Sequence, residues 1–74
     1  MEQRIAIFPG SFDPYTIGHA SIVDRALPLF DKIVVAIGVN RNKRSFLTEE
    51  QRIRMIADLY ADEPKVEVIS YDGL

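Results

Sequence analysis

The sequence predicts an α/β protein with a parallel sheet, built in the order β-α-β-α-β. Three short apolar runs alternate with two stretches whose apolar residues recur at helical spacing. The middle run, residues 32–39, is apolar almost throughout, which is typical of a strand covered on both faces. This order implies right-handed crossovers between parallel strands. We therefore expect one half of a doubly wound, Rossmann-like fold with the strand order 3-2-1.

The first expected strand covers residues 4–8, whose letters are RIAIF. Its β-branched apolar residues are followed by Pro9 and Gly10, which should end the strand. The loop that comes next, PGSFDPYTIGH, contains the only histidine in the chain, His19.

The first expected helix begins after Thr16, a suitable N-cap, and ends near Leu27, because Pro28 disrupts a regular helix. This start places His19 in the first turn of the helix. The residues that share the spacing of a buried helix face are His19, Ile22, Val23, Ala26, Leu27 and Phe30.

The second expected helix, residues 48–60, has clearer signals. Thr48 and Gln51 form a capping-box pair, and two glutamates suit the positive end of the helix dipole. Its predicted apolar stripe comprises Ile53, Ile56, Ala57 and Tyr60. The third expected strand, residues 66–70, alternates between apolar and polar at first, which indicates an edge or half-covered strand.

In this strand order, both helices cover the same face of the sheet. The middle strand nevertheless predicts cover on both faces, and residues 1–74 offer no further element to supply it. A chain this short buries only about 60% of its unfolded surface even as a complete domain. We therefore expect residues 1–74 to be the first half of a single larger domain. Its open sheet face should favour self-association or instability in isolation.

The composition is that of a globular protein, with 47% hydrophobic and 27% charged residues and a net charge of −2. The chain has no overall excess of positive charge that would suggest a nucleic-acid partner. No apolar run approaches the roughly 20 residues that span a bilayer, so no membrane association is expected. The amino terminus also lacks the features of a signal peptide. The absence of cysteine excludes disulfides and cysteine metal sites and agrees with a cytoplasmic location.

The PGSFDPYTIGH loop is the expected functional site, because ligands of open α/β sheets bind beyond the carboxyl ends of the strands. Free N–H groups in the first helical turn attract anions. Gly18 allows a phosphate to approach the backbone, and a neutral His19 can donate a hydrogen bond to a phosphate oxygen. The loop matches neither GxGxxG nor GxxxxGK[ST], and no second histidine suggests a metal site.

This loop resembles the [ST]FDPxTxGH signature of the phosphopantetheine adenylyltransferases, within the nucleotidyltransferase superfamily that carries HxGH or TxGH motifs. Further similar stretches are IVDRA, FDKIVVAIGVN, NK and FLTEEQR. The resemblance covers essentially the whole chain, but only about the first half of the family's usual domain. Ser11 stands where many members have threonine, and it retains the hydroxyl group.

The resemblance implies transfer of the adenylyl group of ATP to 4′-phosphopantetheine by direct in-line attack, giving dephospho-coenzyme A and pyrophosphate. It implies that His19 contacts ATP and stabilises the transition state at the α-phosphate. Ser11 and the Phe12 amide match further ATP contacts, and Ser11 and Lys43 match contacts to the acceptor phosphate. Mg²⁺ is expected to arrive with ATP, without a metal site on the protein. The family is commonly hexameric, and the isolated piece is expected to be inactive.

Other interpretations are open at this point. The acceptor could be that of a nicotinate-nucleotide adenylyltransferase or a glycerol-phosphate cytidylyltransferase, although those enzymes more often carry histidine at the position of Thr16. The chain could also be an inactive phosphate-binding or assembly fragment. Taken alone, His19 could be a packing histidine, and Arg41, Lys43 and Arg44 could form a solvated basic loop.

Overall fold

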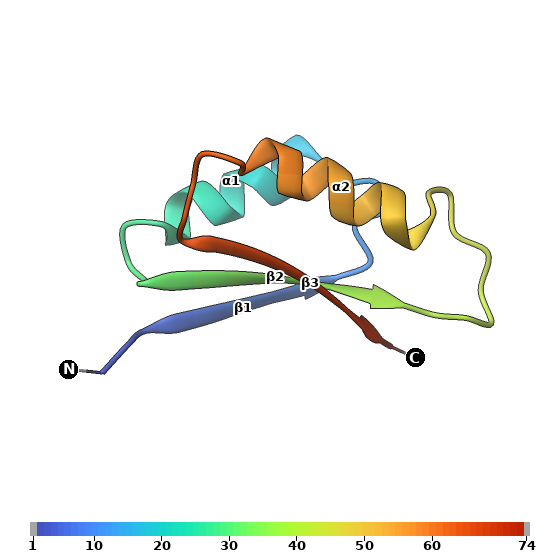
Figure 1. Cartoon of the computed structure of the whole chain (residues 1–74), viewed down its shortest axis with the longest axis horizontal. Helices are drawn as coiled ribbons and strands as arrows, with labels where there is room; N and C mark the ends of the chain where they lie inside the picture. The colour runs from blue at the N-terminus through green and yellow to red at the C-terminus, as the bar shows by residue number, and fades with distance from the viewer. Residues whose placement is uncertain (1, 74) are drawn as a thin grey trace.

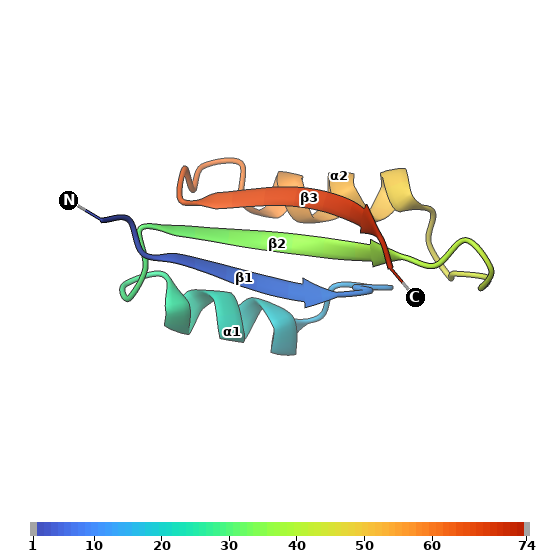
Figure 2. The same cartoon turned by 90° about the horizontal axis from the view of Figure 1, so that it is seen from below.

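The computed structural model describes residues 2–73, which form a three-stranded parallel sheet and two helices. The strand order is β1-β2-β3, in agreement with the sequence prediction. Figure 1 shows both helices on one side of the sheet, and Figure 2 shows the sheet from its other side, so the expected one-sided cover is confirmed. The bounds are β1 (Ile5–Gly10), α1 (Ile17–Ala26), β2 (Lys32–Val39), α2 (Glu49–Leu59) and β3 (Val66–Asp72).

The limits of two strands differ from those predicted. β1 does not end before Pro9 and Gly10 but continues through both, in register with the second half of β2. A proline fits here because β1 is an edge strand of the described sheet. Its outer side pairs with no other described strand, so the missing N–H of proline leaves no hydrogen bond unmade there. β3 likewise extends beyond Ser70 to Asp72, because its last residues also pair with β2. Pairing between strands thus overrides the local turn signals.

Both helices begin where the sequence predicts. Thr16 is the N-cap of α1 and Thr48 that of α2, and each helix has a complete capping box. In α2 the Oε1 atom of Gln51 accepts the Thr48 N–H at 2.9 Å, as expected. In α1 the same place is taken by His19, whose Nδ1 atom accepts the Thr16 N–H at 2.9 Å. The imidazole therefore stabilises the start of α1, a role that the sequence pattern did not indicate.

The core lies between the two helices and one face of β2. Its fully buried side chains are Ile33, Val35 and Ile37 of β2, Val23 of α1 and Ile56 of α2. Two members of the predicted apolar stripes, Ile22 and Ala57, are exposed instead. Only one apolar side chain of each helix is fully buried, Val23 in α1 and Ile56 in α2, so the buried arc is narrower than the stripe that the periodicity predicts.

The opposite face of the sheet is not covered by any of residues 2–73. On it, Ile5, Ile7 and Ile69 are 49%, 68% and 42% exposed. Ala36 of β2 is only 4% exposed, because its small side chain lies between the neighbouring strands β1 and β3. The exposed apolar area that the sequence predicts is therefore present.

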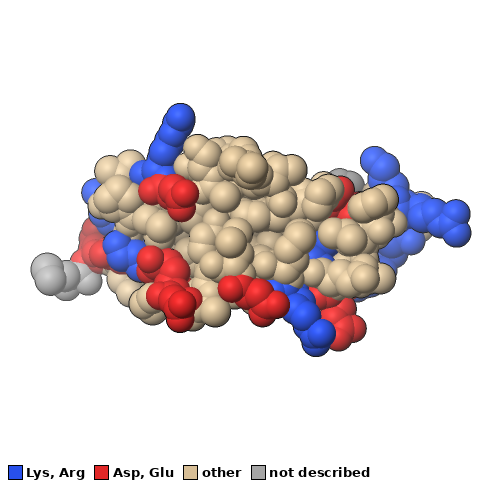
Figure 3. Space-filling view, turned by 90° about the horizontal axis from the view of Figure 1, so that it is seen from above, with Lys and Arg blue, Asp and Glu red and all other residues tan. Residues whose placement is uncertain are grey.

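The charged side chains lie mainly around the rim of the helix side, as Figure 3 shows. Lys and Arg side chains gather at the end where the β2–α2 loop lies. That loop carries the exposed residues Arg41, Lys43 and Arg44. Neither helix of the described chain has the length and apolar character needed to cross a membrane.

Truncation of Ile56 tests the importance of this core. Its side chain is fully buried, so Ile56→Ala should lower the free energy of unfolding by about 2–5 kcal/mol through lost burial and a cavity. Leu59 lies on the same helix and is 59% exposed, so Leu59→Ala is the matched control and should cost less than about 1 kcal/mol. Urea unfolding measures both, and equal losses in the two variants would contradict the assigned core.

Candidate functional site

Two adjoining pockets open at the carboxyl ends of β1 and β2. Their volumes are about 160 Å³ and 310 Å³. The residues common to both pockets are Ser11, Gly38, Asn40 and Lys43. Ser11 follows β1 directly, and Lys43 lies in the loop after β2, so parallel pairing of the two strands brings both to one edge of the sheet. The structure thus unites two of the predicted site residues.

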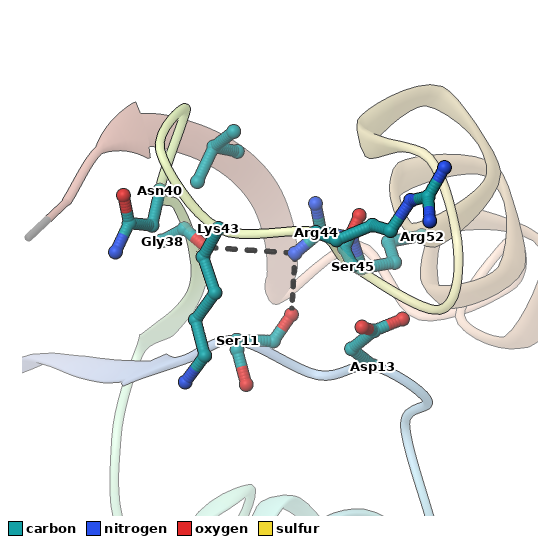
Figure 4. Close-up of a pocket in the computed structure, with 9 residues that line it drawn as sticks. Ser11, Asp13, Gly38, Asn40, Lys43, Arg44, Ser45 and Arg52 are labelled. Carbon is teal, nitrogen blue, oxygen red and sulfur yellow. Dashed lines mark hydrogen bonds between the residues drawn. The ribbon is translucent and has the colours of Figure 1, made fainter.

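The smaller pocket is drawn in Figure 4. Lys43 extends from the β2–α2 loop toward Ser11, whereas the Arg44 side chain points away from both. The turn that carries Lys43 is closed by its N–H, which donates to the carbonyl of Asn40 at 3.1 Å. This arrangement directs one of the three loop cations to the predicted phosphate site.

Asp13 ties the two loops of the site together. Its carboxylate accepts the backbone N–H of Phe46 at 2.5 Å and that of Leu47 at 2.6 Å. These bonds join the β1–α1 loop to the residues just before α2. Asp13 is therefore a structural member of the site, whereas the sequence singled out only the loop that contains it.

Arg52 is the site residue that the sequence analysis missed. It is only 3% exposed and lines the smaller pocket. Its Nη1 atom donates to the carbonyl of Ser11 at 2.9 Å and to that of Gly38 at 3.5 Å, as the dashed lines in Figure 4 show. Its Nε atom donates to the Thr48 carbonyl at 3.3 Å. The available signal was its spacing, four residues before Ile56 on the buried side of α2.

Phe12, another predicted site residue, is an anchor for the loop. Its ring is 2% exposed and packs against the rings of Phe8, Tyr15 and His19, with centroid distances of 5.1, 5.4 and 4.9 Å. Its φ of 49° lies in the left-handed region, which is strained for a bulky side chain. Gly10 makes this packing possible, because a Cβ atom there would lie 2.9 Å from the Phe12 ring. The buried ring therefore holds the strained backbone beside Ser11.

His19 lies in this aromatic cluster and lines neither of the two pockets. Because its Nδ1 atom accepts the Thr16 N–H, the ring is neutral in this arrangement and carries its proton on Nε2. The structure thus groups Ser11 with Lys43 and Phe12 with His19. The Ser11–Phe12 peptide connects the two groups.

A pair of tyrosines supports the aromatic cluster from α2. The hydroxyl groups of Tyr15 and Tyr60 are 2.6 Å apart and share a hydrogen bond. Burial raises the pKa of Tyr15 far above its ordinary value, and the hydrogen bond to Tyr60 adds to the effect. Burial likewise raises the pKa of Tyr60. Both groups therefore stay neutral and serve as a link between the β1–α1 loop and the end of α2.

The first turn of α2 is connected to β3 and to the basic loop. The Ser70 hydroxyl donates to the Oε2 atom of Glu49 at 2.7 Å, and Arg41 lies 3.3 Å from Oε1. Arg41 also lies 3.3 Å from a carboxylate oxygen of Asp72. The hydrogen bond from Ser70, followed by the charge of Arg41, holds the pKa of Glu49 below its ordinary value. Arg41 is thus occupied by carboxylates, unlike Lys43.

No group of three or more acidic or histidine side chains among residues 2–73 is placed to bind a metal ion. The polar side chains that line the pockets carry hydroxyl, amide, ammonium and guanidinium groups together with a single carboxylate, that of Asp13. Such a set suits an anion better than a divalent cation.

Comparisons with known proteins agree with this description. Residues 7–74 match the family model described as cytidylyltransferase-like. The chain is 58% identical over 71 residues to a phosphopantetheine adenylyltransferase of Flavobacterium johnsoniae, covering 96% of this chain and 47% of that protein. It is 50% identical over 74 residues to the enzyme of the same name from Porphyromonas gingivalis, covering 100% of this chain and 48% of that protein.

A similar solved structure is that of NadR protein in complex with NR. Its TM-score is 0.85 and its sequence identity 25%, and the match covers 95% of this chain and 20% of the other. The chain spans about half the length of the two phosphopantetheine adenylyltransferases described above.

The pH dependence of stability tests the environment of Glu49. In Ser70→Ala the pKa of Glu49 should rise toward its ordinary value of 4.5, because the hydrogen bond that lowers it most is gone. A lowered native pKa contributes stability that is fully present above the unfolded pKa and is lost as the pH falls through the native one. Ser70→Ala should therefore be less stable than the wild type near neutral pH, and the difference should shrink at acid pH.

Unfolding by urea at several pH values, together with an NMR titration of the Glu49 carboxyl group, measures this effect. Ser21→Ala removes an exposed hydroxyl on α1 and should give a difference that does not vary with pH. A pH-independent loss in Ser70→Ala as well would contradict the assigned bond.

Proposed function

The chain belongs to the cytidylyltransferase-like family, and we propose that it is the first half of a phosphopantetheine adenylyltransferase domain. The complete protein would transfer the adenylyl group of ATP to 4′-phosphopantetheine, giving dephospho-coenzyme A and pyrophosphate. The observation that carries this proposal is the 58% identity, over 71 residues, to a relative of that name. The hexameric assembly and the cytoplasmic location stay predictions.

The pocket shared by Ser11 and Lys43 suits the phosphate of the acceptor. Lys43 offers an ammonium group with no ion-pair partner among residues 2–73, and Ser11 offers a hydroxyl donor. An oxygen of the acceptor phosphate would attack the α-phosphorus of ATP, and the bond to the bridging oxygen would break to release pyrophosphate. Catalysis of this kind needs positioning and charge stabilisation more than a covalent intermediate.

His19 is proposed to stabilise the charge that develops on the α-phosphoryl oxygens. Its neutral ring carries the proton on Nε2, and its Nδ1 atom is fixed by the Thr16 N–H, so the donor is held in one orientation. The start of α1 adds the positive end of the helix dipole. Mg²⁺, bound through the oxygens of ATP, would neutralise part of the triphosphate charge.

A hybrid protein tests the proposed activity. The matching 71-residue segment of the Flavobacterium johnsoniae relative is replaced by this chain, so that the relative supplies the rest of the domain. The folded hybrid should release pyrophosphate from ATP in the presence of 4′-phosphopantetheine, and the isolated 74-residue chain should not. Nicotinate mononucleotide, and glycerol 3-phosphate with CTP, are the alternative substrates. A folded hybrid that converts only one of these would contradict the proposal.

Substitution of His19 tests its role within that hybrid. His19→Ala should lower kcat by about 10²–10³-fold with a much smaller change in KM, because the donor acts chiefly in the transition state. His19→Asn is the matched variant, since its amide oxygen can still cap the Thr16 N–H while the Nε2 donor is lost. We expect His19→Asn to be as inactive as His19→Ala but closer to the wild type in stability. A nearly normal kcat in either variant would reject the assignment.

A further inference from the structure

Arg52 is a buried cation without a buried anion. Only 3% of the Arg52 surface is exposed. All of its hydrogen bonds within residues 2–73 go to neutral carbonyl oxygens. No carboxylate of the described chain lies within ion-pair distance of its guanidinium group. A charge that is removed from water is costly unless something compensates it. An anion bound in the adjoining pocket would provide that compensation.

The carboxylates near Arg52 are already engaged. Asp13, the one acid that lines the smaller pocket, accepts two backbone N–H groups with its two oxygens. Glu49 is bound by Ser70 and Arg41, and the charge of Arg52, beyond ion-pair distance, has the weakest of the effects on the Glu49 pKa. The pocket is therefore lined by three cations, Lys43, Arg44 and Arg52, and by a single anion. Its net positive charge favours a phosphate.

The guanidinium group also joins the start of its own helix to two segments that are distant in the sequence. Through Nη1 it binds the Ser11 carbonyl after β1 and the Gly38 carbonyl in β2, and through Nε it binds the Thr48 carbonyl at the start of α2. Only the planar arrangement of several N–H donors in arginine can make these bonds at once. The position of Ser11 relative to the end of β2 therefore depends on Arg52.

We propose that Arg52 is a positioning residue of a phosphate-binding pocket formed by Ser11 and Lys43. It holds the Ser11 turn against the end of β2, and its unneutralised charge strengthens the binding of a phosphate group by the other two residues. This inference rests on the proposed function, and it adds to that function a residue on α2 that need not touch the substrate.

Three variants of the hybrid protein test the inference, with inorganic phosphate as the probe. Arg52→Gln removes the charge and most of the donors, so the Kd for phosphate should rise about tenfold. Arg52→Lys keeps the charge but cannot bridge the three carbonyls, so the Kd should rise less, within about threefold, while kcat falls about tenfold because Ser11 is displaced. Arg54→Gln removes an exposed charge from the same helix and is the control, with Kd and kcat unchanged.

Lys43→Gln identifies the pocket, because it should abolish the same phosphate binding. A merely structural role for Arg52 would lower the yield or the melting temperature, but the folded fraction would bind phosphate with the Kd of the wild type. That result, or a normal kcat in Arg52→Lys, would overturn the inference. Failure of the wild-type hybrid to bind phosphate at all would overturn it too.

A measurement on the wild type covers the case in which Arg52→Gln does not fold. Titration with phosphate should shift the NMR signal of the Arg52 Nε–H group together with the Ser11 amide, and should leave the Arg54 signal in place. An unmoved Arg52 signal at saturating phosphate would contradict the inference.

The two proposals fail in different ways. Phosphate binding that depends on Arg52, without adenylyl transfer to 4′-phosphopantetheine, would reject the proposed function and leave the pocket inference intact. Normal adenylyl transfer together with normal phosphate binding in both Arg52 variants would reject the pocket inference and leave the proposed function intact.

Discussion

The arrangement of the candidate site depends on one buried guanidinium group. Arg52 reaches from α2 to the carbonyl groups that follow β1 and end β2, at 2.9 Å from Ser11 and 3.5 Å from Gly38. The pairing of β1 with β2 ends at Gly10 and Ile37, so these two carbonyls, each from the next residue of its segment, lie at the same edge of the sheet just beyond that pairing. A carbonyl that is partly removed from water and lacks a donor is unfavourable, so the arginine stabilises both strand ends and fixes their separation.

The β1–α1 loop is held from two further directions. Asp13 binds the backbone before α2, and the buried ring of Phe12 keeps its own backbone in a left-handed conformation. The next residues lead to the capped start of α1, where His19 accepts the Thr16 N–H. A loop fixed at its middle and at its end can present donors in a constant geometry. That is the principal requirement of the phosphoryl transfer proposed for this family member.

The face of the sheet opposite the two helices exposes apolar side chains. Ile5, Ile7 and Ile69 are exposed there, whereas the face below the helices is densely packed. An apolar patch of this kind on a sheet is typical of a surface that another element covers. The chain spans about half the length of its curated relatives, and we predict that it is half of a domain. The other half of the domain would then cover these exposed residues.

The sequence by itself determined the order of the elements and the two N-caps, Thr16 and Thr48, because periodicity and capping depend on residues a few positions apart. The strand order was expected only from the fold class that this order of elements indicates. It also singled out Ser11 and Lys43, through a motif and its spacing. Only the tertiary structure decided that these two share a pocket, that β1 continues past its proline and glycine, and that Arg52 is buried. Those features depend on contacts between segments 14 to 41 residues apart, such as the bonds from Arg52. The spacing of Arg52 from Ile56 indicates only that it lies on the buried side of α2, not which carbonyls it binds.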